Sequence, residues 1–211
     1  MGNKVRVLFV PHHGAAAAER EPLREWKRRA VWGNAGRNEL VAGVAAGLAE
    51  RPVKTLRELG AGAGVRLPGR AERRVVVLAE TAEHARRLAE LLPGWEVMDA
   101  IPTGRNTVGP RDEPGADDSK RDAIATLVYA ARNGVSCDAL VRATAGTGGL
   151  NWNSFRAGAG DPGTAPALLV DVADESCGRM RTDSEARRRE YREQKLKGAA
   201  AARSRSKSRN T

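Results

Sequence analysis

The sequence predicts an α/β protein, a three-layer sandwich in which helices cover both faces of a mainly parallel sheet. Residues 74–79 form a continuous apolar run, which is typical of a strand buried on both faces. A helical pattern over 82–92 and a second short strand over 95–98 follow, and together they make a βαβ unit. Similar apolar runs recur later in the chain, so we expect them to join the same sheet.

The first part of the chain is predicted to hold a strand and two helices. Residues 5–10 form the strand, which we expect Pro11 to end. Residues 23–49 are compatible with helix, but Gly33 and Gly36 interrupt the pattern, so we expect two helices joined there. The next stretch, 51–73, is rich in glycine and is predicted to be a flexible loop.

The helix over 82–92 is predicted to be amphipathic. Thr81 precedes it and supplies a side-chain oxygen that can cap its first turn. Its apolar face is predicted to contain Ala85, Leu88, Ala89 and Leu92. We expect that face to lie against the sheet.

The second half of the chain alternates strands with shorter connections. Residues 103–120, rich in Gly, Pro and Asp, are predicted to be a second flexible loop. The remaining expected elements are strands over 123–128, 138–143 and 167–172, a short turn or helix over 129–133 closed by Gly134, and a charged helix over 183–196. The low-complexity residues 197–211 are predicted to be a disordered basic tail.

Charge is distributed unevenly along the 211 residues, whose formal net charge is +10. Residues 1–37 carry +5, residues 38–178 carry −3, and residues 179–211 carry +8. The basic character therefore belongs to the two ends, and it favours a polyanionic partner such as nucleic acid.

Several classes of protein are excluded by composition. No apolar run approaches the roughly 20 residues that a membrane-spanning helix needs, so we expect no membrane association. We find no export signal at the start and expect a cytoplasmic protein in which Cys137 and Cys177 are reduced thiols. The two Cys and three His are scattered, so no metal site is expected.

Two glycine-rich stretches, 60–64 and 144–149, invite a phosphate-binding interpretation. A P-loop needs Gly-Lys followed by Ser or Thr between a strand and a helix, and no such sequence exists here. We therefore expect both stretches to be flexible connections. Acidic residues close the last strand, and Asp171, Asp174 and Glu175 could hold a metal there. We expect them instead to cap the following helix and to stay solvated.

Three segments occur in a recognisable order: 74–92, 95–99 and 123–143. Residues 79–84, Ala-Glu-Thr-Ala-Glu-His, follow a strand and open a helix. Thr126 then ends a strand, small residues and Asn133-Gly134 follow, and Asp138-Ala-Leu-Val-Arg142 forms the next strand. The series resembles the second, C-terminal RecA-like domain of superfamily-two DEAD/DEAH-type helicases, over roughly residues 5–195. The flanks at 32–42 and 168–191 are also similar to those of phage-type and bacterial members.

The resemblance implies a three-layer RecA-like, P-loop NTPase-like domain over 23–196, preceded by a strand and linker over 1–22. It implies the C-terminal lobe of an ATP-dependent helicase that grips single-stranded DNA or RNA. The P-loop lobe is absent, so ATP and Mg would be bound only through an N-terminal lobe on a separate chain. The arginine-bearing sixth motif is missing, and Arg156 is the only basic residue in the loop where it should lie. Arg156 is therefore the candidate arginine finger, the alternative being an ordinary solvated arginine.

The candidate site residues follow from the resemblance and from the basic segments. For nucleic-acid binding they are Thr81, Arg105, Asn106, Thr126, Asn133, Arg188 and Arg205. For nucleotide binding they are Gly134, Asp138 and Arg142. The chain alone is not expected to hydrolyse ATP.

Two other classes of function remain open. One is a non-enzymatic nucleic-acid-binding module, or a decayed helicase fragment, that binds through the basic carboxyl-terminal residues. The other is a small Rossmann-like enzyme, which requires Gly-x-Gly-x-x-Gly after the first strand. Gly14 followed by four alanines does not supply that motif, so this class ranks last.

Overall fold

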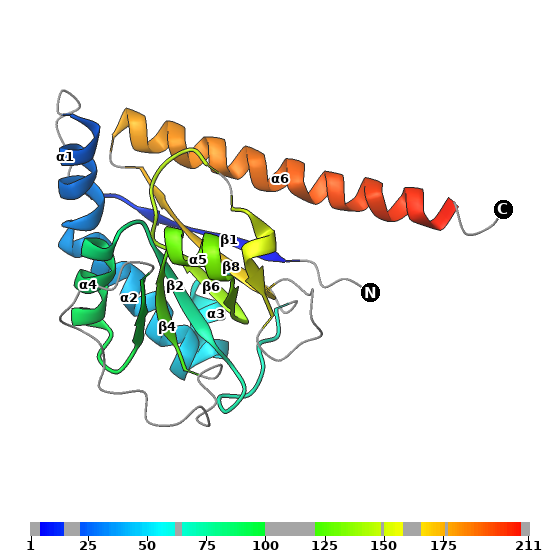
Figure 1. Cartoon of the computed structure of the whole chain (residues 1–211), viewed down its shortest axis with the longest axis horizontal. Helices are drawn as coiled ribbons and strands as arrows, with labels where there is room; N and C mark the ends of the chain where they lie inside the picture. Colours follow the sequence, from blue (N-terminus) through cyan, green and yellow to red (C-terminus); the bar gives the residue numbers. More distant parts are fainter. Residues whose placement is uncertain are drawn as a thin grey trace.

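The structure, a computed structural model, describes residues 5–14, 22–61, 65–99, 121–148, 150–157, 166–175 and 177–207, with the backbone alone over 194–207. Its main sheet has six strands in the order β1-β8-β6-β2-β4-β3, and every neighbouring pair is parallel (Figure 1). The strands are β1 (Arg6–His12), β2 (Val75–Ala79), β3 (Glu96–Met98), β4 (Ala123–Thr126), β6 (Ala139–Arg142) and β8 (Leu168–Asp174). The predicted class, α/β with a mainly parallel sheet flanked by helices, is confirmed.

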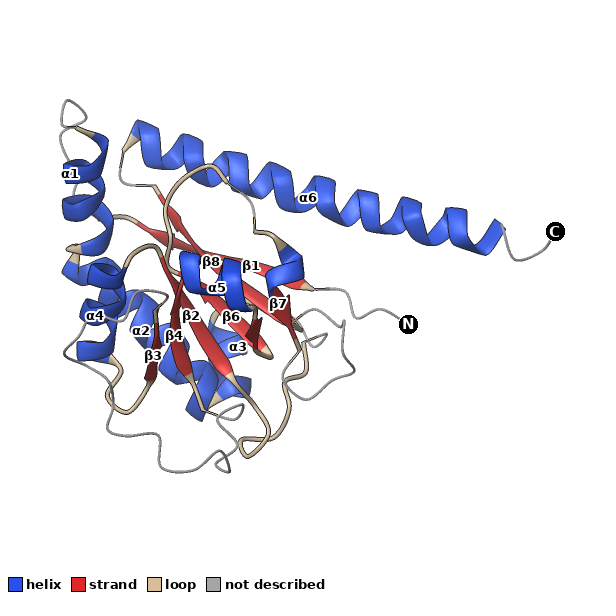
Figure 2. Ribbon diagram, viewed as in Figure 1, coloured by secondary structure: helices blue, strands red, loops and turns tan. Residues whose placement is uncertain are grey.

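Helices cover both faces of this sheet, as Figure 2 shows. On one face, the core residues of α2 (Ala35–Glu50), α3 (Pro52–Glu58) and α4 (Ala82–Leu91) pack against alternate residues of the strands. The opposite face is covered by α5 (Leu127–Asn133), the small sheet of β5 (Val135–Ser136) and β7 (Phe155–Arg156), η3 (Trp152–Ser154) and α6 (Gly178–Lys207). The central strand β2 is buried along its whole length because both faces are covered.

A third apolar cluster joins the first helical segment to the start of the last helix. The helix α1 (Leu23–Lys27) continues directly into a π-helical turn, η1 (Arg28–Trp32). Trp26 and Val31 from this segment pack with Cys177 and Met180 at the start of α6. This contact places α1 and the start of α6 beside each other at the edge where the strands end (Figure 1).

The connections that leave the central strands run over opposite faces. After β2 the chain enters α4 on one face, whereas β4 and β6, its neighbours in the sheet, continue into α5 and the β7 region on the other face. The loops therefore separate at the carboxyl ends of β2, β4 and β6. Such a switch point is the usual ligand position in an open parallel sheet.

Several elements differ from the prediction. Helix α3 lies inside the range 51–73, which was predicted to be a loop, because Pro52 stands at its first position and Leu56 is buried against the core. Helix α5 begins at Leu127, inside the predicted strand 123–128, because the Thr126 side chain caps it.

The first strand and the last helix are also longer than predicted. Pro11 lies within β1 rather than ending it. Helix α6 begins at Gly178 and extends to Lys207, so residues 197–207, predicted to belong to a disordered tail, are helical. The predicted loop 103–120 lies outside the described residues. No described helix is both long and apolar enough to cross a membrane.

Candidate functional site

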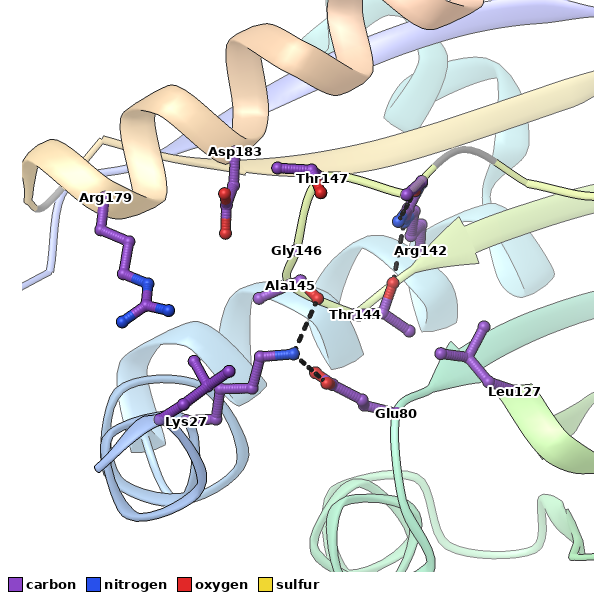
Figure 3. Close-up of a pocket in the computed structure, with 12 residues that line it drawn as sticks. Lys27, Glu80, Leu127, Arg142, Thr144, Ala145, Gly146, Thr147, Arg179 and Asp183 are labelled. Atoms are coloured by element: carbon purple, nitrogen blue, oxygen red, sulfur yellow. Dashed lines mark hydrogen bonds and ion pairs between the residues drawn. The ribbon is translucent and has the colours of Figure 1, made fainter. Parts of the chain in front are cut away.

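A pocket of about 520 Å³ lies at the switch point, where β2, β4 and β6 end. Its lining comes from α1, from the ends of the three strands and from the first turns of α6 (Figure 3). The lining residues are Leu23, Lys27, Glu80, Leu127, Arg142, Thr144, Ala145, Gly146, Thr147, Gly148, Arg179 and Asp183. Three of these side chains are cationic and two are anionic, so the pocket wall carries a surplus of positive charge.

The loop after β6 forms one wall of the pocket, and two buried arginines fix its backbone. Arg142 Nη2 donates to the Gly148 carbonyl at 2.6 Å, and Arg187 Nη1 donates to the Gly146 carbonyl at 2.9 Å. Arg142 Nε also donates to Thr144 Oγ1 at 2.8 Å. Gly146 has φ +120, a conformation that side chains rarely adopt, so glycine is required at this turn.

Both arginines belong to one buried polar network centred on Asp171 at the end of β8. Arg187, 1% exposed, donates to both carboxylate oxygens of Asp171 at 3.0 to 3.2 Å. The Tyr191 hydroxyl donates to Asp171 Oδ2 at 2.9 Å and accepts from Arg142 Nη1 at 2.6 Å. Burial lowers the pKa of Arg187, but the charge and hydrogen bonds of Asp171, together with the nearby Tyr191 and Asp174, raise that pKa above its usual value.

The network contains more positive than negative charge. Arg142 is 4% exposed, and its Nη1 lies 4.0 Å from the nearer Asp171 oxygen, with the Tyr191 hydroxyl bonded to both. Arg187 makes the direct contacts to that carboxylate. One carboxylate therefore serves two guanidinium groups. A buried charge without a full counter-charge is costly, and an anion in the pocket beside Arg142 would supply the missing one.

A second buried ion pair beside this network is balanced. Arg37 of α2 donates to both oxygens of Asp174 at 2.8 and 3.1 Å and to the Ala143 carbonyl. His12 Nδ1 lies 3.3 Å from Asp174 Oδ1. Burial alone would raise the pKa of Asp174, but the charges of Arg37 and Arg187 and the hydrogen bonds from Arg37 and His12 together hold that pKa below its usual value. This pair joins α2, β6 and β8 below the pocket.

Helix α1 contributes an ion pair to the opposite wall. Lys27 Nζ bonds Glu80 Oε1, and it lies 3.5 Å from the Ala145 carbonyl (Figure 3). Trp32 Nε1 donates to Glu80 Oε2 at 3.3 Å, so the Glu80 carboxylate is held from two sides. Arg179 at the start of α6 also lines the pocket, and its guanidinium stacks on the Trp26 ring at 5.3 Å.

His84 lies in the first turn of α4 and is fully buried. Its Nδ1 accepts from the Glu80 backbone N–H at 3.4 Å, and its Nε2 lies 3.2 Å from Asn38 Oδ1. These partners fit a neutral ring that carries its proton on Nε2. Burial, with the nearby charges of Arg37 and Arg87, lowers the pKa of His84 to about 3. The histidine therefore stays neutral at pH 7 and ties α4 to α2.

Three of the residues predicted from sequence lie at the pocket edge. Arg142 lines the pocket itself. Thr81 and Thr126 directly adjoin its lining, but their hydroxyl groups cap α4 and α5 by accepting from His84 N and Tyr129 N, each at 3.2 Å. Thr126 Oγ1 also donates to Asp99. Their side chains thus fix the helix starts beside the pocket.

Four predicted residues lie at the other edge of the sheet. Asn133 and Gly134 end α5, and Asp138 precedes β6, where its carboxylate accepts from the Arg74 backbone N–H at 2.8 Å. Arg156 is exposed in β7 and pairs with Ser136. The predicted nucleotide-binding residues are therefore separated, because the strand between Asp138 and Arg142 spans about 13 Å at roughly 3.3 Å per residue.

The other predicted residues lie away from the pocket, or their side chains lie outside the part of the chain that the structure describes. The Arg188 guanidinium contacts Glu175 at 3.4 Å and stacks on Phe9 at 5.0 Å. Arg205 belongs to α6, where the backbone alone is described. Arg105 and Asn106 lie outside the described residues.

The expectation that Asp171 and Asp174 are solvated helix caps is wrong. Both are buried and bound to arginines that are distant in sequence, which is why no local pattern revealed them. The loop 144–148 was expected to be a simple connection, yet it lines the pocket. Sequence reasoning also missed Lys27, whose role depends on the packing of α1 across the sheet edge.

Comparisons of the chain with protein-family models, with curated proteins and with solved structures found no match. Within the described residues, no group of three or more His, Cys, Asp or Glu side chains could hold a metal ion. The pocket's own side chains combine hydrogen-bond donors with a surplus of positive charge, a combination that suits an anionic group.

Proposed function

We propose that the chain is the C-terminal, RecA-like lobe of a superfamily-two helicase. In this role it grips the phosphates of single-stranded nucleic acid and completes the ATP site of a separate P-loop lobe. The proposal joins the motif resemblance in the sequence to a pocket that suits a phosphate group. ATP and Mg would be held by the first lobe, since the chain has no Gly-Lys-[Ser/Thr] sequence.

The observation that carries the proposal is the charge of Arg142. Its guanidinium is buried against the pocket and shares one carboxylate with Arg187. A phosphate oxygen at this point would accept charge-assisted hydrogen bonds in a partly desolvated site. Arg179 lies on the opposite side of the same pocket and adds a second positive charge there, whereas the Lys27 charge is paired with Glu80 (Figure 3).

In the proposed function, the arginine that faces the phosphate differs from the candidate that the sequence suggested. Arg156, the arginine-finger candidate from sequence, is exposed in β7 beside the start of β6, at the edge of the sheet away from the pocket. Arg142 ends β6 at the edge where the pocket opens. In the proposed function, Arg142 rather than Arg156 faces the phosphate.

Binding of labelled single-stranded DNA and RNA, measured by fluorescence anisotropy, tests the proposal. We expect Arg142→Gln and Arg179→Gln each to weaken binding roughly tenfold, because each removes a charge-assisted contact. The matched control is Arg156→Gln, which should bind as the wild type does. Circular dichroism establishes that each variant is folded. Equal effects from all three variants, or no binding by the wild type, would contradict the proposal, as would ATP hydrolysis by the purified chain alone.

The non-enzymatic binding module is kept as a second candidate because of one observation. Residues 179–211 carry +8, and α6 extends well past the sheet (Figure 1). Removal of residues 198–211 separates the two functions. In the binding module the truncation abolishes nucleic-acid binding, whereas in the helicase lobe the pocket variants still weaken the binding that remains.

A further inference from the structure

The Tyr191 hydroxyl stands between two groups of opposite charge. It accepts from Arg142 Nη1 at 2.6 Å and donates to Asp171 Oδ2 at 2.9 Å, while these two groups are 4.0 Å apart. Burial and the Asp171 charge raise the pKa of Tyr191, so the hydroxyl keeps its proton and can donate at neutral pH. The hydroxyl therefore fills a position through which Arg142 and Asp171 would otherwise meet directly.

The ring of Tyr191 is fixed independently of its hydroxyl. It contacts Phe9 of β1 and Trp152 of η3, with ring centroids 6.0 and 6.3 Å apart, and it is buried on the face of the sheet opposite α2. The ring thus holds the oxygen in place, and the oxygen does not depend on Arg142 for its position. One turn earlier on α6, Arg187 Nη2 donates to the other carboxylate oxygen, Asp171 Oδ1.

These contacts decide where the charge of Arg142 is directed. With the hydroxyl present, the guanidinium bonds the Gly148 carbonyl and Thr144 at the pocket wall. Without it, the same guanidinium, whose Nη1 already lies 4.0 Å from Asp171 Oδ2, would move closer and donate to the carboxylate directly, since attraction between unit charges strengthens as they approach in a buried site. The guanidinium would then be drawn from the pocket wall towards the carboxylate and would present less of its charge to a ligand.

We propose that Tyr191 is a positioning residue whose hydroxyl keeps Arg142 from donating directly to Asp171 and so holds its guanidinium at the pocket wall, towards a phosphate. This inference rests on the proposed function. It makes α6 part of the site, because the same helix supplies Arg179 to the pocket and Arg187 to the loop carbonyl. The hydroxyl itself does not contact the ligand.

The test compares Tyr191→Phe with Tyr129→Phe, the same chemical change at the chain's other tyrosine. Phenylalanine keeps the ring contacts, so the variant retains the packing of α6. Affinity for a labelled single-stranded oligonucleotide is measured over a range of salt concentrations, with the full chain. We expect Tyr191→Phe to weaken binding roughly tenfold and to lower the salt slope by about one, as Arg142→Gln does. Tyr129→Phe should change neither quantity.

The double variant Arg142→Gln/Tyr191→Phe provides the readout that general loosening of the structure would not produce. If the hydroxyl acts through Arg142, the double variant binds as Arg142→Gln does, because the two effects are not additive. Additive losses, or a Tyr191→Phe affinity equal to that of Tyr129→Phe, overturn the inference and leave the proposed function standing. If Arg142→Gln itself binds like the wild type, the proposed function fails and the inference fails with it.

Discussion

The two edges of the sheet use buried charge in different ways. At the amino edge, where the strands begin, Asp138 and Asp122 accept from the backbone N–H groups of Arg74 and Val75 at 2.8 and 2.7 Å. The Arg74 side chain bonds the Arg121 carbonyl and lies 3.8 Å from Glu96. These charges connect the starts of neighbouring strands. At the carboxyl edge, Arg142 and Arg187 share the single carboxylate of Asp171, and the remaining positive charge borders a pocket.

The difference separates structural charge from charge that is available to a ligand. The carboxylates at the amino edge accept hydrogen bonds from backbone N–H groups at the starts of strands. These carboxylates are therefore already occupied and are not available to a ligand. The carboxyl edge combines a surplus cation with a cavity, and both features are needed for anion binding. This comparison predicts that equivalent substitutions at the two edges have different consequences.

The largest difference is expected between Asp171→Asn and Asp138→Asn. Asparagine at position 171 removes the only carboxylate of the network and leaves two buried guanidinium groups without it, at a cost of about 3–5 kcal/mol of unfolding free energy. Asparagine at position 138 keeps an oxygen that can accept from Arg74 N, so we expect a loss of about 1 kcal/mol. Urea denaturation measures both. Equal losses would show that the two edges do not differ in this respect.

An intermediate loss of unfolding free energy is expected at low pH, through the buried His84. The pKa of His84 is about 3 in the folded protein and near 6.5 when the chain is unfolded, so the unfolded state binds more protons between these values. The contribution of His84 to the free energy of unfolding is therefore fully present above pH 6.5. It falls as the pH drops towards 3, by about 1.4 kcal/mol per pH unit once well below 6.5.

Denaturation midpoints measured from pH 7 to pH 4 test this effect. We expect His84→Gln to flatten the pH dependence in that window, because it removes the group that titrates only on unfolding. Above pH 4 the buried Asp174 contributes little, since its lowered pKa makes its contribution fall away below the unfolded value near 3.9. A variant with the same slope as the wild type would assign the acid sensitivity to other groups.

The smallest effect is expected at the pocket's ion pair. Lys27→Met removes the partly buried charge that bonds Glu80, and we expect a loss of about 1 kcal/mol, because Trp32 still donates to that carboxylate. Arg28→Met, one residue along, breaks an exposed pair with Glu83 and should leave stability unchanged. Thermal denaturation of both variants gives the comparison. A larger loss for Arg28→Met would contradict the assignment of Lys27 to a structured pocket wall.

The sheet was predictable because each strand carries its own signal. The run Val75–Ala79 is apolar on both faces, and Thr81 caps the following helix as predicted, with Ala85, Leu88 and Leu92 buried. Helix α3 was missed because its amphipathic pattern is short and lies among glycines. The register of β8 beside β1 could not be predicted, because pairing partners 162 residues apart, such as Arg6 and Leu168, leave no local trace.

The candidate site was only partly predictable for the same reason. Thr126 and Arg142 end their strands, so their position at one edge followed from the pattern. Asp138 and Gly134 were grouped with Arg142 because of the helicase resemblance, yet they stand at the opposite edge. Arg187 lies in a run of three arginines, and only its helical position distinguishes the buried one from its neighbours.

The sequence by itself determined the α/β class, the parallel strands, the helix start after Thr81 and the uneven placement of charge, because these depend on local patterns of residue type. The tertiary structure decided which charges are paired and which are in surplus. That outcome depends on distances between side chains from β6, β8 and α6, and on the Tyr191 hydroxyl between two of them. Electrostatic energy depends on separation and burial, and a chain acquires both only when distant segments pack together.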